Sequence, residues 1–215
     1  IEGVDTIEPF NHRVIPDRIE AGTFAAAAVT TAGRITIENC RPAHLGALIE
    51  RLKKCGAEIE ASEDSMTVTG PGEIGPVDID TGFYPAFPTD MQAQFVAMNA
   101  VADGVGTIIE TIFENRFMHV LELQRMGADI RIEGNTAIST GVPQLTGAPV
   151  MATDLRASVS LILAGLAAEG LPRRRVTSTL TTRSTWPQRG PSARGGRGRA
   201  AAGTATRTGR APRRG

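Results

Sequence analysis

Four charged residues stand where helices are expected to begin: Asp90, Arg116, Asp154 and Arg156. A carboxylate can take a proton from a reacting group, and a guanidinium can bind phosphate or carboxylate through several N–H groups. Each residue type also has a purely structural explanation at such a position. The helix dipole favours an acid in the first turn, an Asp can cap a helix, and an Arg in the first turn is usually solvated. Taken alone, these residues leave both acid–base chemistry and helix capping open.

Other kinds of chemistry find little support in the sequence. Cys40 and Cys55 form no CxxC pair and have no histidine at metal-ligand spacing, so we expect no metal site and no disulfide framework. No glycine-rich phosphate loop of the Walker or Rossmann type is present, so neither ATP nor NAD, nor any other cofactor, is expected. The longest apolar stretch, Val159 to Ala168, is too short to span a bilayer.

The elements that must position the four charged residues form a repeated pattern. The segment Leu52 to Ile59 can be laid over Leu123 to Ile130, at an offset of 71 residues. Each copy has a helical segment ending near a glycine, a β-rich run, a second helix, and two short strands joined by a polar turn. The first helical segments are predicted at Thr23 to Gly33 and Met91 to Gly104, and a third copy begins at Val150 and stops at Gly170.

Each repeat is therefore predicted to read β-α-β-α-β-β, which makes the chain an α/β protein. In the second helix of the first copy, Leu45, Leu48, Ile49 and Leu52 fall on one face, as expected for a helix packed on a core. A repeat of this kind cannot bury both helices alone, so the copies should pack around a shared core.

The charge of the chain divides it into two regions, 1–170 and 171–215. The first holds all 23 acids against two lysines and nine arginines, a net charge of −12, and the second holds twelve arginines and no acid. The second region has too few apolar residues to bury a core, so we expect it to be disordered. A frame shift in a GC-rich gene is the favoured origin. The alternative is that the second region is a functional tail, which binds nucleic acid non-specifically through its phosphates.

Four segments carry a resemblance to one enzyme family: Pro85 to Phe95, Glu110 to His119, Met151 to Ser158 and, more weakly, Asp17 to Phe24. They resemble the C-terminal half of the UDP-N-acetylglucosamine enolpyruvyl transferases, and the likeness covers residues 1–170. The resemblance implies an inside-out α/β barrel domain of which the third repeat is truncated. The shikimate-pathway enolpyruvyl transferases share the repeat architecture and are the second candidate.

The family's reaction moves the enolpyruvyl group of phosphoenolpyruvate onto the 3-hydroxyl of UDP-N-acetylglucosamine and releases phosphate. It is the first committed step of peptidoglycan synthesis, so the resemblance implies a cytoplasmic transferase of cell wall biogenesis, cell shape and cell division. By resemblance, Asp90 contacts and deprotonates the hydroxyl. Resemblance also puts the backbone of Ile112 and Phe113 beside the nucleotide, and Arg116, Asp154 and Arg156 in the cleft.

The chain departs from the family in what it lacks. The family's enzymes close two such domains over their substrates, and this chain resembles most of one domain, so we expect a fragment that is inactive without the N-terminal domain. The start at Ile1 rather than Met fits a fragment. The truncated third repeat should also expose apolar surface around Leu161, Ile162 and Leu166. A third hypothesis is a non-catalytic protein that binds nucleic acid through its basic tail.

Overall fold

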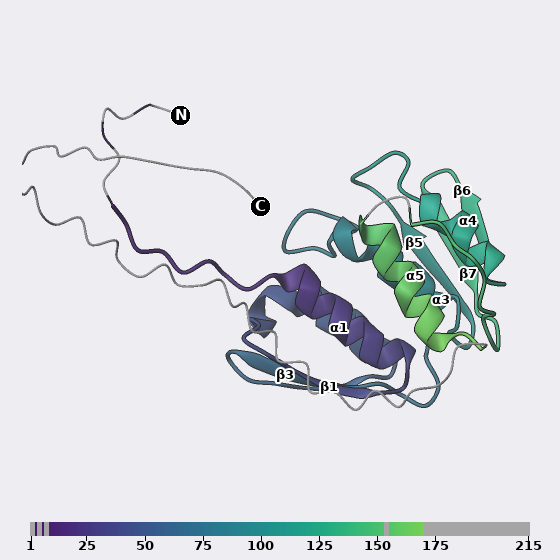
Figure 1. The fold of residues 1–215 in the computed structure, drawn as a ribbon, viewed down its shortest axis with the longest axis horizontal. Helices are drawn as coiled ribbons and strands as arrows, with labels where there is room; N and C mark the ends of the chain where they lie inside the picture. The colour runs from purple at the N-terminus through teal and green to yellow at the C-terminus, as the bar shows by residue number, and fades with distance from the viewer. Residues whose placement is uncertain (1–2, 4–5, 7–8, 153–154, 170–215) are drawn as a thin grey trace, which may run out of the picture. The chain divides into compact units, whose positions relative to one another are not determined.

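The computed structural model of the 215-residue chain describes residues 3, 6, 9–152 and 155–169 (Figure 1). The helices in this part of the chain are α1 (Arg18–Thr30), α2 (Gly46–Lys54), α3 (Gln92–Asn99), α4 (Met118–Arg125) and α5 (Leu155–Ala167). Two short 3-10 turns, η1 (Pro42–Leu45) and η2 (Thr89–Met91), lead directly into α2 and α3. The predicted tail, residues 171–215, lies outside the described residues.

The strands form two sheets, each with the pairing of one repeat. The first sheet has the order β1-β3-β2 and is antiparallel, with strands β1 (Arg34–Glu38), β2 (Glu58–Ala61) and β3 (Ser65–Thr69). The second has the order β4-β5-β7-β6, with strands β4 (Ile79–Asp80), β5 (Val105–Ile109), β6 (Asp129–Glu133) and β7 (Thr136–Thr140). Strand β4 runs parallel to β5, and the other pairs in this sheet are antiparallel.

The strand registers confirm the predicted repeat. Arg34 lies opposite Thr69 in the first sheet, and Val105 lies opposite Thr140 in the second, so both partners are displaced by the same 71 residues. The second repeat has the predicted order β4-α3-β5-α4-β6-β7. In the first repeat, the described residues ahead of α1 form no strand, and neither sheet closes into a barrel within the described ranges.

Two pairs of glycines close the repeats in the same way. The N–H of Gly70 donates to the carbonyl of Gly33 at 2.7 Å, and the N–H of Gly141 donates to that of Gly104 at 2.8 Å. A Cβ atom at Gly141 would overlap the carbonyl oxygen of Ala102, and one at Gly70 would overlap that of Ala28. Both positions therefore need glycine because the backbone at the end of the helical segment passes so close.

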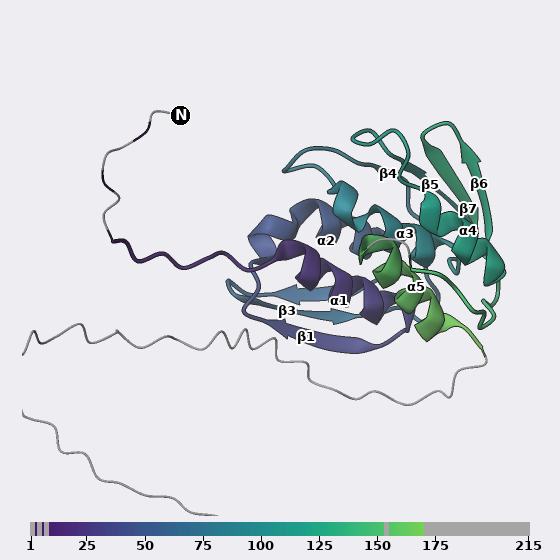
Figure 2. The same ribbon diagram turned by 45° about the horizontal axis from the view of Figure 1, so that its top comes forward.

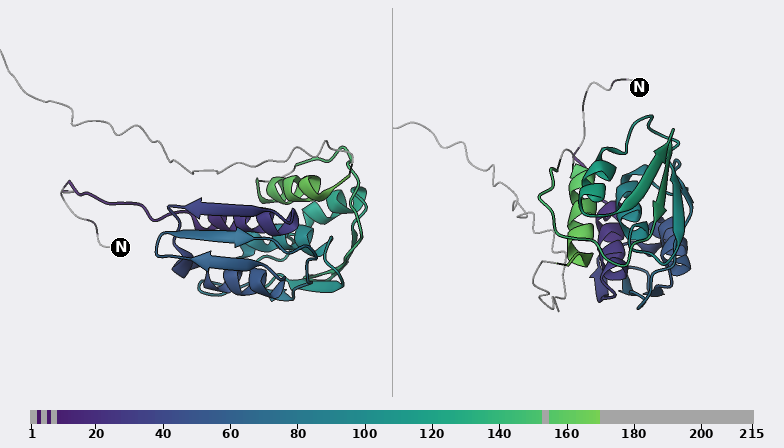
Figure 3. Two further views of the ribbon diagram at one scale, coloured as in Figure 1. Left: turned by 90° about the horizontal axis from the view of Figure 1, so that it is seen from below. Right: turned by 90° about the vertical axis from the view of Figure 1, so that its right-hand side faces the viewer.

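The first helices of the three repeats pack against one another in the centre, and the sheets lie outside them (Figure 1). Figure 2 shows α1 and α2 on the same face of the first sheet, and in the left panel of Figure 3 the strands of that sheet lie in front of α1. The close packing of α1 is possible because Ala25 and Ala26, both fully buried, present only small side chains. Bulkier buried side chains fill the space around these helices: Leu48, Leu52, Phe95, Met98, Ile108 and Leu123. Among the described residues, no helix combines the length and the apolar character needed to cross a membrane.

The first helix begins earlier than its apolar pattern predicts. It starts at Arg18 rather than near Thr23, because the Asp17 carboxylate accepts hydrogen bonds from the N–H groups of Ile19 at 2.7 Å and Glu20 at 3.3 Å. This is N-capping, which satisfies donors that the first turn leaves without partners.

Helix α5 has one apolar face without cover from the described residues. Ile162 and Leu166 are 61% and 54% exposed, as we expected, whereas Leu161, which we also expected to be exposed, is only 5% exposed. The prediction for Leu161 was wrong because α5 turns this side chain into the core beside α3. The exposed face is the one that points away from the other first helices.

Candidate active site

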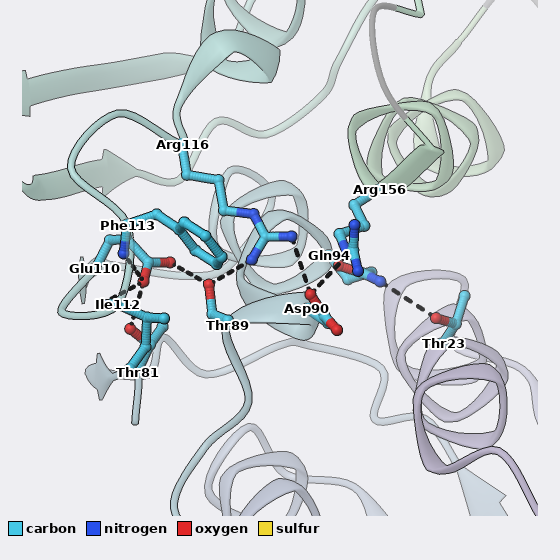
Figure 4. A network of polar contacts seen from close by, with 10 residues as sticks. All are labelled: Thr23, Thr81, Thr89, Asp90, Gln94, Glu110, Ile112, Phe113, Arg116 and Arg156. Atoms are coloured by element: carbon cyan, nitrogen blue, oxygen red, sulfur yellow. Dashed lines mark hydrogen bonds and ion pairs between the residues drawn. The ribbon is translucent and has the colours of Figure 1, made fainter. Parts of the chain in front are cut away.

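The starts of three helices meet at one place. Asp90 lies in η2 at the start of α3, Arg116 lies just before α4, and Arg156 lies in the first turn of α5. Figure 4 shows these side chains pointing toward one another from three different segments. Residues far apart in the sequence are thus brought together by the packing of helices from consecutive repeats.

Asp90 is held by both arginines. Its Oδ1 atom lies 2.9 Å from Nη2 of Arg116 and 2.6 Å from Nε of Arg156. The side chain of Asp90 is 33% exposed, so the carboxylate is accessible from solvent although it is paired on one side. The three groups together carry a net positive charge, which favours an anion close by.

The electrostatics of the site keep Asp90 ionised. Partial burial acts to raise the pKa of Asp90, but the hydrogen bonds and positive charges of Arg156 and Arg116 outweigh it and hold this pKa below its ordinary value. The N-terminal end of α3 also favours a negative charge at this position. Asp90 is therefore a carboxylate at neutral pH.

Arg116 is fixed on two sides besides its ion pair. Its Nη1 atom donates to Oγ1 of Thr89 at 2.6 Å, and its guanidinium lies over the ring of Phe113, 4.6 Å from the centroid. A guanidinium held by a hydroxyl, a ring and a carboxylate has little freedom to rotate. The orientation of Arg116 is therefore set by residues 89 and 113 as well as by Asp90.

Behind Arg116 lies a buried acid, Glu110, which is 2% exposed. Its Oε2 atom accepts a hydrogen bond from Oγ1 of Thr89 at 2.7 Å. Its Oε1 atom accepts from Oγ1 of Thr81 at 2.8 Å and from the N–H groups of Ile112 at 2.9 Å and Phe113 at 3.3 Å. Glu110 therefore links the end of β5, the loop that follows it and the start of α3 (Figure 4).

Gln94, in α3, adds a contact to α1. Nε2 of Gln94 donates to Oγ1 of Thr23 at 3.2 Å, and Gln94 lies beside Asp90 and Arg156 in Figure 4. Its Oε1 atom is buried and accepts no hydrogen bond from any residue that the structure describes.

The cysteines are not placed for chemistry. Cys55 is fully buried, and this burial raises its pKa to about 12. Burial also raises the pKa of Cys40, against the opposing effect of backbone hydrogen bonds. Both are free thiols, and because the thiolate is the reactive form, neither is a nucleophile at neutral pH. Within the described ranges, no group of three or more His, Cys, Asp and Glu residues is arranged to hold a metal ion.

The structure brings three of the predicted site residues, Asp90, Arg116 and Arg156, into direct contact. Ile112 and Phe113 lie next to this cluster, and their N–H groups donate to Glu110. Asp154 lies outside the described residues.

Sequence reasoning assigned no role to Thr81, Thr89 or Glu110, which complete the cluster. One signal was present: Glu110 directly follows the apolar strand ending Ile108-Ile109, so an acid stood at the end of a buried strand. Such a residue must find hydrogen-bond donors nearby or leave a charge buried.

Comparison with known proteins places the chain in a family. The family model described as EPSP synthase (3-phosphoshikimate 1-carboxyvinyltransferase) matches residues 1–189. The UDP-N-acetylglucosamine 1-carboxyvinyltransferase of Halorhodospira halophila is 55% identical over 173 residues, which are 80% of this chain and 41% of that protein. The protein of the same name from an Anaeromyxobacter species is 55% identical over 170 residues, 79% of this chain and 40% of the relative. The chain thus spans about two fifths of the length of these curated relatives.

Solved structures show the same fold. The enolpyruvyl transferase NikO from Streptomyces tendae matches with a TM-score of 0.64 and 28% identity, over 72% of this chain and 37% of that one. An EPSP synthase from Acinetobacter baumannii matches with a TM-score of 0.54 and 18% identity, again over 72% and 37%. On the family match over most of its length, and on its identity to two carboxyvinyltransferases, the chain belongs to the enolpyruvyl transferase family of EPSP synthase and UDP-N-acetylglucosamine 1-carboxyvinyltransferase.

Proposed function

We propose that this chain supplies one side of the active site of a UDP-N-acetylglucosamine enolpyruvyl transferase. In the proposed reaction, the 3-hydroxyl oxygen of the sugar bonds to C2 of phosphoenolpyruvate. The bond from C2 to the phosphate oxygen breaks, and phosphate leaves. The methylene carbon is protonated when the C–O bond forms, and it loses a proton when the double bond is restored. The observation that carries the proposal is the Asp90 carboxylate held ionised between Arg116 and Arg156.

The proposed role of Asp90 is to accept the proton of the 3-hydroxyl. The two arginines that keep Asp90 ionised also weaken it as a base, because a lowered pKa means a lower affinity for a proton. We therefore propose that one arginine moves from Asp90 to an anionic group of a substrate during the reaction, which would restore the basicity of Asp90. Arg156 is the better candidate for such a move, since its side chain is 45% exposed while that of Arg116 is 18% exposed.

The proposed activity needs the part of the enzyme that this chain does not resemble. Substrates must be held from both sides and shielded from water, and the chain spans about two fifths of its relatives. We propose that residues 1–170 are most of one inside-out α/β barrel domain, and that residues 171–215 are outside it and frame-shifted. The family reaction would put the complete enzyme in the cytoplasm, in peptidoglycan synthesis and thus in cell shape and division.

We propose UDP-N-acetylglucosamine rather than shikimate 3-phosphate as the acceptor because of sequence identity. Identity to the two UDP-N-acetylglucosamine 1-carboxyvinyltransferases is 55%, whereas identity to the EPSP synthase structures is 17–18%. Nucleic-acid binding through the twelve arginines of the tail stays as a second candidate, and its support is the charge of that segment alone.

A phosphate-release assay with phosphoenolpyruvate tests this function. The full chain alone should give no turnover with UDP-N-acetylglucosamine. A chimera of the Halorhodospira relative, in which residues 1–170 replace the matching segment, should release phosphate with UDP-N-acetylglucosamine and not with shikimate 3-phosphate. The unmodified relative is the control. A folded chimera that releases phosphate with neither acceptor would overturn the proposal, and preference for shikimate 3-phosphate would transfer it to the other branch of the family.

A further inference from the structure

Glu110 and Thr89 form a relay of hydrogen bonds behind Arg116 that the proposed reaction does not itself use. The relay runs from Glu110 Oε2 to Thr89 Oγ1 at 2.7 Å and from Thr89 Oγ1 to Arg116 Nη1 at 2.6 Å. The other amino group of Arg116, Nη2, reaches Asp90 at 2.9 Å. A buried acid is thus connected to the proposed base through a hydroxyl and a guanidinium.

The chemistry of the groups fixes the direction of every bond in the relay. Four donors surround the two oxygens of Glu110, two hydroxyls and two backbone N–H groups. The guanidinium of Arg116 can only donate, so the Thr89 oxygen accepts from it and the Thr89 hydroxyl hydrogen is left to donate to Glu110. The lone pairs of the Thr89 oxygen are then turned toward Arg116, which can only donate.

A second threonine uses the same arrangement in the same cluster. The hydroxyl of Thr81 donates to Glu110 at 2.8 Å and accepts from the N–H of Thr111 at 2.9 Å. Glu110 therefore orients two hydroxyls, one toward a backbone group and one toward Arg116. The bond through Thr89 reaches Arg116 directly, whereas those to Thr81, Ile112 and Phe113 hold the loop after β5, which carries the ring of Phe113 against Arg116.

We propose that Glu110 and Thr89 are positioning residues, which hold the Arg116 guanidinium so that it pairs with Asp90 and keeps that carboxylate ionised. The catalytic meaning of this positioning rests on the function proposed above, whereas the effect on Asp90 does not. Among the residues that the structure describes, the charged groups paired with Asp90 are Arg116, from the segment before α4, and Arg156, from α5. If the relay is cut, the Arg116 side chain spends less time on Asp90, and the stabilisation of the ionised form weakens.

The test measures the ionisation of Asp90 in the full chain and needs no enzyme activity. Aspartate carboxyl carbons are labelled with ¹³C and titrated by NMR, and the Asp90 signal is identified by its loss in Asp90→Asn. In Thr89→Val, which keeps the shape and removes the hydroxyl, the pKa of Asp90 should rise toward its ordinary value. Thr89→Ser, which keeps the hydroxyl, should restore the low value.

Thr81→Val is the matched control, because it also removes a hydroxyl that donates to Glu110 but lies off the path to Arg116. It should leave the pKa of Asp90 unchanged. Glu110→Gln should raise this pKa, and the double variant with Thr89→Val should raise it no further than the larger single effect, since both cut one relay. Thr89→Ala makes the same cut if the valine variant does not fold.

An unchanged or lower pKa of Asp90 in a folded Thr89→Val or Thr89→Ala variant would overturn the positioning role. An equal rise in Thr81→Val would also overturn it, because the effect would then come from general loosening of the loop. The outcome is separate from that of the phosphate-release assay: an inactive chimera refutes the proposed function while the titration still decides the relay.

Discussion

Asp90 makes both of its ion pairs through one short side chain. Asp90→Asn removes the negative charge of this side chain and keeps its shape, so it tests the charge alone. Asp90→Asn in the active chimera keeps the size of the side chain and removes the group that would accept the proton. We expect kcat to fall by at least about 10²-fold, the usual scale for losing a positioned general base, with a smaller change in KM. Initial rates of phosphate release check this prediction. Asp129→Asn, at an exposed strand position, is the control, and near-normal kcat in Asp90→Asn would return Asp90 to the role of a helix-start acid.

The ion pairs of Asp90 should also make stability depend on pH. Because its pKa in the folded chain is lower than in the unfolded chain, Asp90 contributes stability that is fully present above its unfolded value of about 4. That contribution is lost as the pH falls through the lower, folded value. The difference in unfolding free energy between the full chain and its Asp90→Asn variant should therefore be constant near neutral pH and shrink in acid. Urea titrations at several pH values measure it, and a difference that grows in acid would contradict the lowered pKa.

At the scale of the elements, the two repeats share one steric requirement. Gly141 leaves no room for a Cβ atom beside the carbonyl of Ala102, and Gly70 leaves none beside that of Ala28. Gly141→Ala should lower the free energy of unfolding by about 1–3 kcal/mol, the usual cost of overpacking, and Gly70→Ala should have a similar effect. Gly46→Ala is the matched control. It has open space around its Cβ position and a helical conformation, so it should be neutral or slightly stabilising.

Chemical denaturation of the full chain and the three variants measures these effects. A Gly141→Ala variant as stable as Gly46→Ala would show that the helix end moves aside at no cost. Equal losses at 70 and 141 would show that the repeats are similar in energy as well as in register.

The elements were largely predictable because the repeat appears twice in the sequence. A pattern seen in one copy supports the same prediction in the other. This holds for the strands at 34–37 and 106–109 and for the glycines at the ends of the helical segments. The start of α1 was missed because it depends on one capping side chain, Asp17, rather than on periodicity. The relay was missed for a different reason. Thr81, Thr89 and Glu110 come together only through the parallel pairing of β4 with β5, which joins segments about 30 residues apart.

For the site, too, the sequence predicts some features and not others. Asp90, Arg116 and Arg156 could be named from family resemblance, yet neither resemblance nor spacing predicts that both arginines bind one carboxylate. Such a contact depends on the packing of α3 against α5 and on the loop before α4. The sequence shows these segments but does not give their distances.

At the scale of the whole molecule, the uncovered face of α5 sets the behaviour expected in solution. Ile162 and Leu166 are exposed on a helix whose opposite side is core. Two adjacent exposed apolar side chains on one helix face favour self-association. We expect the full chain to associate as concentration rises, and the double variant Ile162→Gln with Leu166→Gln to associate less at unchanged thermal stability. Sedimentation velocity and thermal melts measure the two properties.

Leu161→Gln is the matched control on the same helix. Because Leu161 is buried, this change should lower stability rather than reduce association. Equal association of the chain and the double variant would show that the face of α5 is not the contact.

The two oxygens of Asp90 differ in their surroundings. Arg116 and Arg156 both bind Oδ1, and no residue that the structure describes donates a hydrogen bond to Oδ2, which points away from the arginines in Figure 4. A free carboxylate has two equivalent oxygens, and here the arginines remove that symmetry. In the proposed reaction the proton would therefore arrive at Oδ2, so the 3-hydroxyl of the sugar must approach from the side of that oxygen. A crystal structure of the chimera with the sugar nucleotide should place the 3-hydroxyl within hydrogen-bond distance of Oδ2, and a contact with Oδ1 instead would contradict this assignment.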